Sequence, residues 1–209
     1  PKVHMNQIEY LYSLKAYRKK SLDTINHGRL KNNFLETHSP SFRFCNMPLS
    51  EKQKKLKSQM LSSFKFGLFK VFNLPLGFIT GIKIEELTQY SAKTSVKYKY
   101  LNKNPFKSMY FAVLAMAAEL STGALALFSI ASYKESIALL VIESHGKFYK
   151  KATWKITFVC EDGDLFKKAL NECAENNTSA TAKTTSKGFN EDSELVCEYE
   201  FTWSFKIRN

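Results

Sequence analysis

Six stretches of the chain have residue patterns typical of β-strands. Apolar and polar residues alternate in four of them, which indicates strands with one buried face. The clearest is the stretch 197–205, where Cys, Tyr, Phe, Trp and Phe alternate strictly with Glu, Glu, Thr and Ser. The predicted strands cover residues 82–85, 92–100, 137–142, 154–160, 178–186 and 197–205.

One long helix is predicted between the second and third strands, at about residues 105–132. Asn104 is a favourable N-cap residue and Pro105 suits the first helical position, so the start is well marked. A short helix is expected at 164–175. A single apolar helix among six strands must be buried by a sheet that curls around it, so we expect an α+β fold with one antiparallel sheet.

A basic amphipathic helix is predicted ahead of the strands. Ser50 and Gln53 have the spacing of a capping box, and apolar residues then recur at helical intervals among lysines up to Phe72. We therefore divide the chain into an extension of unknown role (1–46), a segment with the basic helix (47–74) and the main body (75–209). Because Met47 opens a segment that leads smoothly into the body, we expect that translation can start there.

Charge is concentrated at the start of the chain. The net charge is +12, and residues 1–71 hold 14 Lys and Arg against 4 Asp and Glu, so +10 of it lies there. The remaining body is nearly neutral. A basic segment with no recognised binding motif is a weak indication of nucleic-acid binding, and we expect none.

The polar residues that often form catalytic or metal sites are scattered. Neither the four cysteines nor the four histidines are spaced as a zinc site, a redox dithiol or a hydrolase triad, and the glycines form no phosphate-binding loop. We therefore expect no metal and no cofactor. Unpaired cysteines and the absence of an apolar secretory run at the start favour a reducing, cytoplasmic location.

Glu119 is the one charged residue between Ser108 and Ser132, in the middle of the long apolar helix. An unpaired buried carboxylate costs several kcal/mol, so its presence needs an explanation. On a helical wheel its neighbours are small apart from one methionine, which leaves room beside the acid. These neighbours are Ser108, Ala112, Ala115, Met116, Thr122, Gly123 and Ala126.

Three interpretations of this helix remain open. It is long enough to span a membrane, although strands of the soluble type flank it. Glu119 could instead be a structural acid, bound to a backbone group or a tyrosine. In the third interpretation Glu119 lines a pocket and acts as a general base or nucleophile, with a pKa raised by its apolar surroundings.

The segment NKNPFKSMYFAVLAMAAELSTG, together with the strand order, resembles the hotdog-fold thioesterase superfamily. The resemblance covers roughly Ser63 to Asn209 and is to a branch of unassigned function related to the phenylacetate-pathway acyl-CoA thioesterases. In that superfamily an Asn precedes a His-Gly-Gly turn by six positions and a helix acid by fifteen. Asn104 and Glu119 match this spacing, whereas Tyr110 replaces the His and Phe-Ala replaces the two glycines.

The resemblance implies a homodimer or dimer of dimers that hydrolyses a fatty or aryl acyl-CoA without metal. Subunits would pair edge to edge, with the thioester between the helix acid and amides at the start of the helix. Glu119 would activate water, Asn104 would orient the acid or the water, and Thr122 would help to place the water. The implied substrate-binding residues are Tyr110, Phe111, Ala112, Met116 and Gly123.

Because two glycines of the superfamily motif are replaced here, a second function without catalysis is also considered. Side chains at Phe111 and Ala112 stand where substrate must approach closely, which is compatible with a protein that binds an acyl-CoA or lipid without turnover. The basic helix also has alternatives. It can pack on the body as an ordinary surface helix, make peripheral contact with an anionic membrane, or attract the phosphates of coenzyme A.

Overall fold

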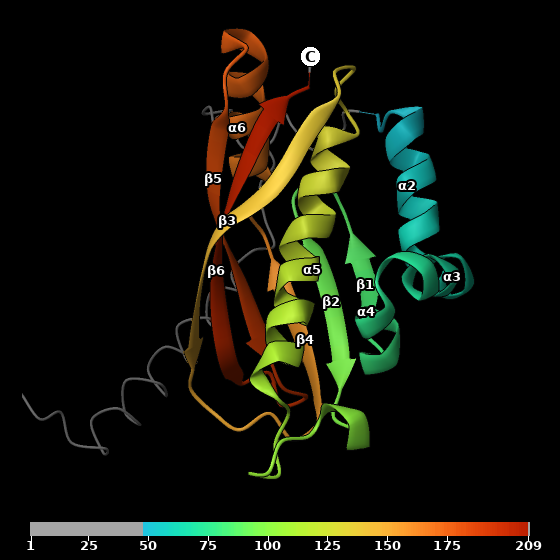
Figure 1. Cartoon of the computed structure of the whole chain (residues 1–209), viewed down its shortest axis with the longest axis vertical. Coiled ribbons are helices and arrows are strands. Elements are labelled where there is room, and N and C mark those ends of the chain that lie inside the picture. Colours follow the sequence, from blue (N-terminus) through green and yellow to red (C-terminus); the bar gives the residue numbers. More distant parts are fainter. Residues whose placement is uncertain (1–47, 209) are drawn as a thin grey trace, which may run out of the picture. The chain divides into compact units, whose positions relative to one another are not determined.

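The computed structural model describes residues 48–208, and these form a six-stranded antiparallel sheet curled around one long helix, α5 (Phe111–Ile130) (Figure 1). Neighbouring strands are ordered β1-β2-β4-β5-β6-β3. The expected α+β architecture is confirmed. The strands are β1 (Lys83–Leu87), β2 (Ala92–Lys97), β3 (Ile137–Phe148), β4 (Lys155–Cys160), β5 (Ala180–Phe189) and β6 (Leu195–Ile207).

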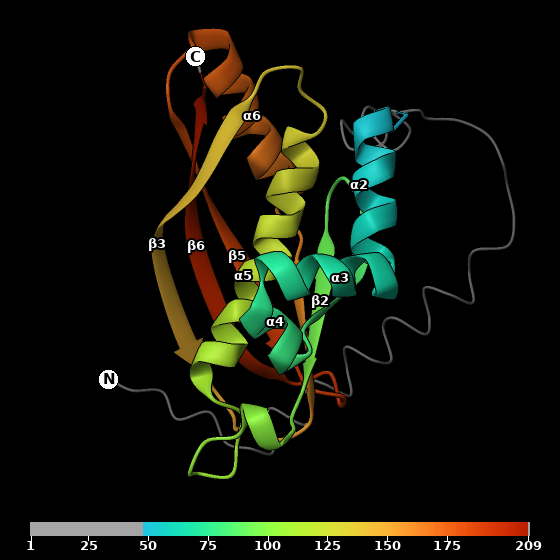
Figure 2. The same cartoon turned by 45° about the vertical axis from the view of Figure 1, so that its right-hand side comes forward.

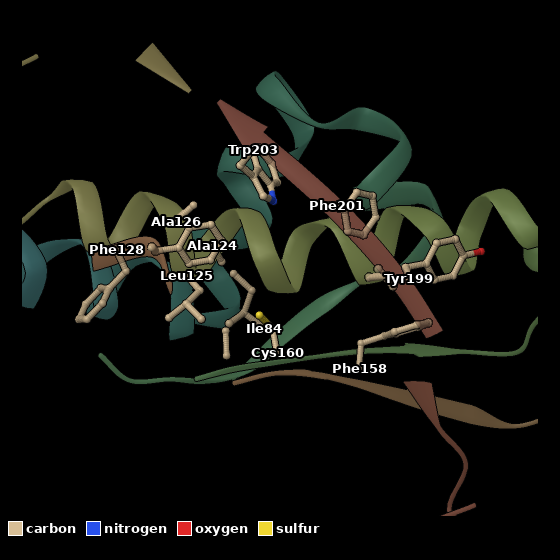
Figure 3. Packing of buried hydrophobic residues seen from close by; sticks show 14 of the residues in the cluster. Ile84, Ala124, Leu125, Ala126, Phe128, Phe158, Cys160, Tyr199, Phe201 and Trp203 are labelled. Atoms are coloured by element: carbon tan, nitrogen blue, oxygen red, sulfur yellow. The ribbon is translucent and has the colours of Figure 1, made fainter. Parts of the chain in front are cut away.

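The core lies between α5 and the concave face of the sheet. Alternation along β6 sends Tyr199, Phe201 and Trp203 toward the helix, and Figure 3 shows these rings approaching it from the strand. Phe158 and Cys160 reach the same core from β4. Most of the apolar surface of α5 is covered in this way, so the helix is the core of the body and the membrane-spanning interpretation is not needed.

Helix α5 begins later than predicted, at Phe111 rather than Pro105. Asn104 does not cap it. Its side-chain Oδ1 accepts hydrogen bonds from the amides of Phe106 and Ser108, which closes a turn, and Lys107 in that turn has a φ of 57°. Asn side chains commonly stabilise turns in this way, and a turn of this shape excludes a helix over 105–110.

The predicted basic helix is two helices, α2 (Glu51–Leu61) and α3 (Ser63–Asn73). The capping box at Ser50 is confirmed, since its hydroxyl accepts from the amide of Gln53 and its own amide donates to the Gln53 side chain. At Ser62 the backbone is extended, and its hydroxyl caps α3 by accepting from the Lys65 amide. Ser competes with the helix for backbone bonds, and here it restarts the helix in a new direction.

A short helix, α4 (Pro75–Thr80), follows α3 and leads into β1. Figure 2 shows α2, α3 and α4 along one flank of α5, near the β1 end of the sheet. On this flank, α5 is covered by helices rather than by strands. The other predicted helix is confirmed as α6 (Gly163–Asn176), between β4 and β5.

The start of α6 packs against the β1–β2 loop so closely that only glycine fits. A Cβ at Gly163 would lie 2.3 Å from the Gln89 carbonyl oxygen and 2.5 Å from the Tyr90 Cα. We expect Gly163→Ala to destabilise the protein by about 1–3 kcal/mol, because the obstructing atoms are backbone and cannot rotate away. Urea unfolding monitored by circular dichroism measures this change.

Gly67→Ala is the matched control, because nothing lies within 4 Å of the position a Cβ would take in α3. Removing a helical glycine should stabilise the protein by about 0.5–1 kcal/mol. Equal midpoints for the two variants would contradict the proposed contact at Gly163.

Candidate functional site

Glu119 lies in the middle of α5, with a half-buried side chain at the wall of a cavity of about 310 Å³. Within residues 48–208 its carboxylate makes no hydrogen bond and no ion pair. Burial among apolar groups raises the pKa of Glu119 above its ordinary value. The cavity wall is otherwise formed by α5, α3, α4 and the start of β1, through Lys70, Asn73, Leu74, Pro75, Leu76, Gly77, Ile82, Met116 and Leu120.

Gly123, one turn beyond Glu119, provides the space that the carboxylate occupies. A Cβ there would lie 3.1 Å from Glu119 Oε1 and 3.2 Å from the Trp203 ring. Thr122 holds that ring, since its hydroxyl accepts from Trp203 Nε1 at 3.1 Å and donates to the Glu119 carbonyl at 3.0 Å. Both hydrogen-bonding directions of the Thr122 hydroxyl are therefore used within the protein. Its contacts are those of a positioning residue.

Lys70 shares the cavity with Glu119, and sequence analysis did not identify it. Its ammonium donates to the Ile82 carbonyl at 2.6 Å and lies 5.1 Å from the centre of the Phe66 ring. Burial, with Lys83 and Lys99 nearby, lowers the pKa of Lys70. In the sequence this lysine is one of many in a basic segment. Only the folded helix shows that it points inward, where it puts a hydrogen-bond donor into the same cavity as the acid.

The start of α5 borders a second cavity, of about 630 Å³. Asn104, Tyr110 and Phe111 line it together with the segment that follows β3. The Asn104 carboxamide faces its own turn, as described above. The amides of Phe111 and Ala112 belong to the first turn of the helix, where N–H groups have no helical acceptor and carry partial positive charge. This cavity therefore has anion-stabilising groups but no acid.

The structure thus places the predicted site residues in two groups. Glu119 and Met116 line one cavity, with Thr122 and Gly123 behind the acid, whereas Asn104, Tyr110 and Phe111 line the other. Ala112 is half-buried on the helix between them. Phe111 and Glu119 are eight positions apart, which is about 12 Å along a helix. One thioester carbon cannot touch both groups within a single chain.

Strand β3 is an edge of the sheet, paired on one side with β6. Leu140 and Ile142 on this strand are exposed, at 65% and 55%. An edge strand with unpaired backbone groups and apolar side chains is a template for pairing with another chain.

Other nucleophiles in the described chain are poor candidates for catalysis. Burial raises the pKa of Cys160 and Cys197 to about 12, so both are protonated thiols at neutral pH. The described residues contain no cluster of three or more metal-binding side chains.

Solved structures with the same fold include several thioesterases. A Pseudomonas aeruginosa protein described as a probable thioesterase has a TM-score of 0.59 at 19% identity, covering 72% of this chain and 99% of that chain. A putative thioesterase from Shewanella oneidensis has a TM-score of 0.59 at 11% identity, covering 73% and 99%. A thioesterase from Haemophilus influenzae has a TM-score of 0.52 at 11% identity, covering 73% and 95%.

No protein-family model matches the sequence, and no curated protein does. At these identities the structural likeness shows the fold, and the expected hotdog fold is confirmed. The link to phenylacetate-pathway enzymes stays a prediction.

Neutralising Glu119 should stabilise the protein in a pH-dependent manner. A raised pKa means that the wild-type fold loses stability as pH rises from the ordinary glutamate pKa through the folded-state pKa. Glu119→Gln removes that loss. We expect its melting temperature to match wild type in acid and to exceed it at pH 7 by roughly 2–4 °C. The exposed Glu191→Gln is the control, and a pH-independent difference at Glu119 would contradict the burial argument.

Proposed function

We propose that this hotdog-fold protein is an acyl-CoA thioesterase-like hydrolase in which Glu119 is the general base. The observation that carries the proposal is an acid without a partner in the described chain, with a raised pKa, at the wall of an apolar cavity. Structural acids are normally paired, whereas catalytic acids are kept available and have shifted pKa values. The apolar wall suits a fatty or aryl acyl group, and the cavity volume is within the usual range for a ligand pocket.

In this mechanism the Glu119 carboxylate takes a proton from water while the water oxygen attacks the thioester carbonyl carbon. The oxyanion that forms is stabilised by N–H donors. When the carbonyl reforms, the C–S bond breaks and the protonated acid returns its proton to the departing thiolate. Direct attack by the carboxylate is the variant in which Glu119 is the nucleophile, and water then hydrolyses the resulting anhydride.

We propose that the oxyanion donors come from a second copy of the chain. Edge-to-edge pairing of two β3 strands gives a continuous sheet and a two-fold axis. The start of α5 in one subunit would then approach Glu119 of the partner subunit, which removes the 12 Å separation found within one chain. The exposed apolar side chains of β3 support this homodimer, which can assemble further into a dimer of dimers.

A second candidate function is binding of an acyl-CoA without hydrolysis. The rings of Tyr110 and Phe111 lie edge to face, 5.0 Å apart, at the start of α5. They stand where small residues would leave the helix amides open to a thioester oxygen. The three free cysteines of the described chain support the cytoplasmic location that we propose for either function.

Hydrolysis of a panel of acyl-CoA substrates, with a free-thiol readout, tests the role of Glu119. Glu119→Gln should lower turnover at least about a hundredfold, because it removes the general base. Wild-type activity should rise with pH, with a midpoint above the ordinary pKa of glutamate. Glu191→Gln should behave as wild type. Equal residual rates in Glu119→Gln and wild type would leave only the binding function.

Mixed dimers test whether the site is shared. Phe111→Pro removes one amide N–H from the start of α5, and the extended conformation of Tyr110 (φ −66°, ψ 133°) accepts a following proline. Each variant alone should be inactive. Co-expressed at equal amounts with Glu119→Gln, it should restore about a quarter of wild-type activity, because half of the dimers contain one intact site. Activity no higher than that of the separate variants would contradict a site shared between subunits.

A further inference from the structure

Helix α3 leaves most of its apolar side chains exposed, although Phe66 is buried on its inner face beside Lys70. Lys70 is 7% exposed, whereas Phe64 and Phe72 on the same helix are 80% and 76% exposed. A surface helix normally buries its apolar stripe and leaves lysines in water. The exposed phenylalanines therefore face something other than bulk water when the protein works.

The exposed apolar residues of this region come from α3, from α4 and from the residue that joins them. Nine large apolar side chains within residues 64–79 are more than 40% exposed, and we call this set the α3–α4 face. An apolar surface of this extent marks an interaction site on a soluble protein. The set consists of Phe64, Leu68, Phe69, Val71, Phe72, Leu74, Leu76, Phe78 and Ile79.

The charged residues near this face indicate which kind of partner it binds. Between Glu51 and Glu85 the sequence has seven lysines and no acidic residue. Lys54 and Lys55 of α2 and Lys65 of α3 are exposed, and Lys54 is paired with Glu51. Apolar side chains bordered by lysines are the composition of helices that lie in the interface of anionic bilayers.

A second copy of the chain is a less suitable occupant. Two-fold pairing through this face would bring the same lysines of both copies together, and of Lys54, Lys55 and Lys65 only Lys54 has an acidic partner in the part of the chain that the structure describes, Glu51. An anionic lipid surface instead supplies opposite charge at the rim and an apolar medium at the centre.

The same segment also walls the Glu119 cavity. Leu74 and Leu76 belong both to the α3–α4 face and to the cavity lining. Figure 2 shows α3 and α4 lying across the flank of α5, so the segment is placed between the helix with the acid and the outside. An acyl chain that leaves a bilayer at this face has a short path to Glu119.

We propose that the α3–α4 face binds anionic membranes and admits the acyl chain of a membrane-associated long-chain thioester to the Glu119 cavity. The second half of this proposal rests on the proposed hydrolase function, whereas the first half does not.

Flotation of the full chain with phosphatidylcholine vesicles, with and without phosphatidylserine, tests the membrane contact. We expect binding to the phosphatidylserine vesicles that weakens as salt increases. The double variant Phe64→Ser, Phe72→Ser should bind at least about tenfold more weakly, because it removes the two most exposed rings of the face. Trp154→Ser is the matched control, since Trp154 is 70% exposed but lies outside the face. It should bind as wild type does.

Activity measurements separate this proposal from the hydrolase function. Neither Phe64 nor Phe72 lines the cavity, so the double variant should hydrolyse a soluble short-chain acyl-CoA at the wild-type rate. Anionic vesicles should accelerate hydrolysis of a long-chain acyl-CoA by the wild type but not by the double variant. Glu119→Gln should still float with vesicles while losing turnover.

Three results would overturn the membrane proposal. The wild type could fail to bind anionic vesicles, or the double variant could bind them as tightly as Trp154→Ser does. The third is a native mass, measured by light scattering, that is lower for the double variant than for the wild type, because this would identify the face as an interface between copies of the chain. Loss of vesicle binding with intact hydrolysis, in contrast, supports it.

Discussion

The structure depends on the burial of one apolar helix by a sheet that covers only part of its circumference. Strands β2, β4, β5 and β6 pack on α5, and this packing forms the core, to which β4 contributes Phe158 and β6 contributes Phe201 and Trp203. The uncovered flank of α5 holds Glu119, Met116 and Leu120, and α3 and α4 close over it incompletely. A cavity beside an acid is thus a consequence of how the helix is wrapped, and the functional proposals concern this one flank.

The sheet and the central helix could be predicted because their signals are local. Period-two alternation identified the strands, and an apolar run with a single acid identified α5. The errors came from side chains that interrupt helices. Asn104 has the sequence of an N-cap but binds the amides of its own turn, and Ser62 lies inside an apolar periodicity yet caps a new helix. Periodicity records which face is apolar and carries little information about such breaks.

The candidate site was predictable in part. An unpaired acid among small residues identified Glu119 and Gly123, and the 3.1 Å approach of a Cβ at Gly123 to the Glu119 carboxylate gives the physical reason. The separation of Asn104 from Glu119 was not predicted, because the sequence analysis assigned residues 105–110 to the helix, whereas the Asn104 side chain closes a turn there and the helix begins at Phe111. The inward position of Lys70 was not predictable either, since helical spacing would assign that position to an apolar residue.

Neither Glu119 nor the α3–α4 face is arranged for the stability of the isolated protein. An ionised carboxylate at an apolar wall lowers stability, whereas phenylalanines left in water add none of the stabilisation that their burial would give, and natural sequences retain such features mainly where function needs them. Both occur on the same flank of α5, and Leu74 and Leu76 belong to the cavity and to the exposed face. The acid, unpaired in the described chain, and the exposed apolar face therefore lie on the same flank of the helix. One ligand with a long apolar chain and a reactive carbonyl explains both features more simply than two unrelated functions do.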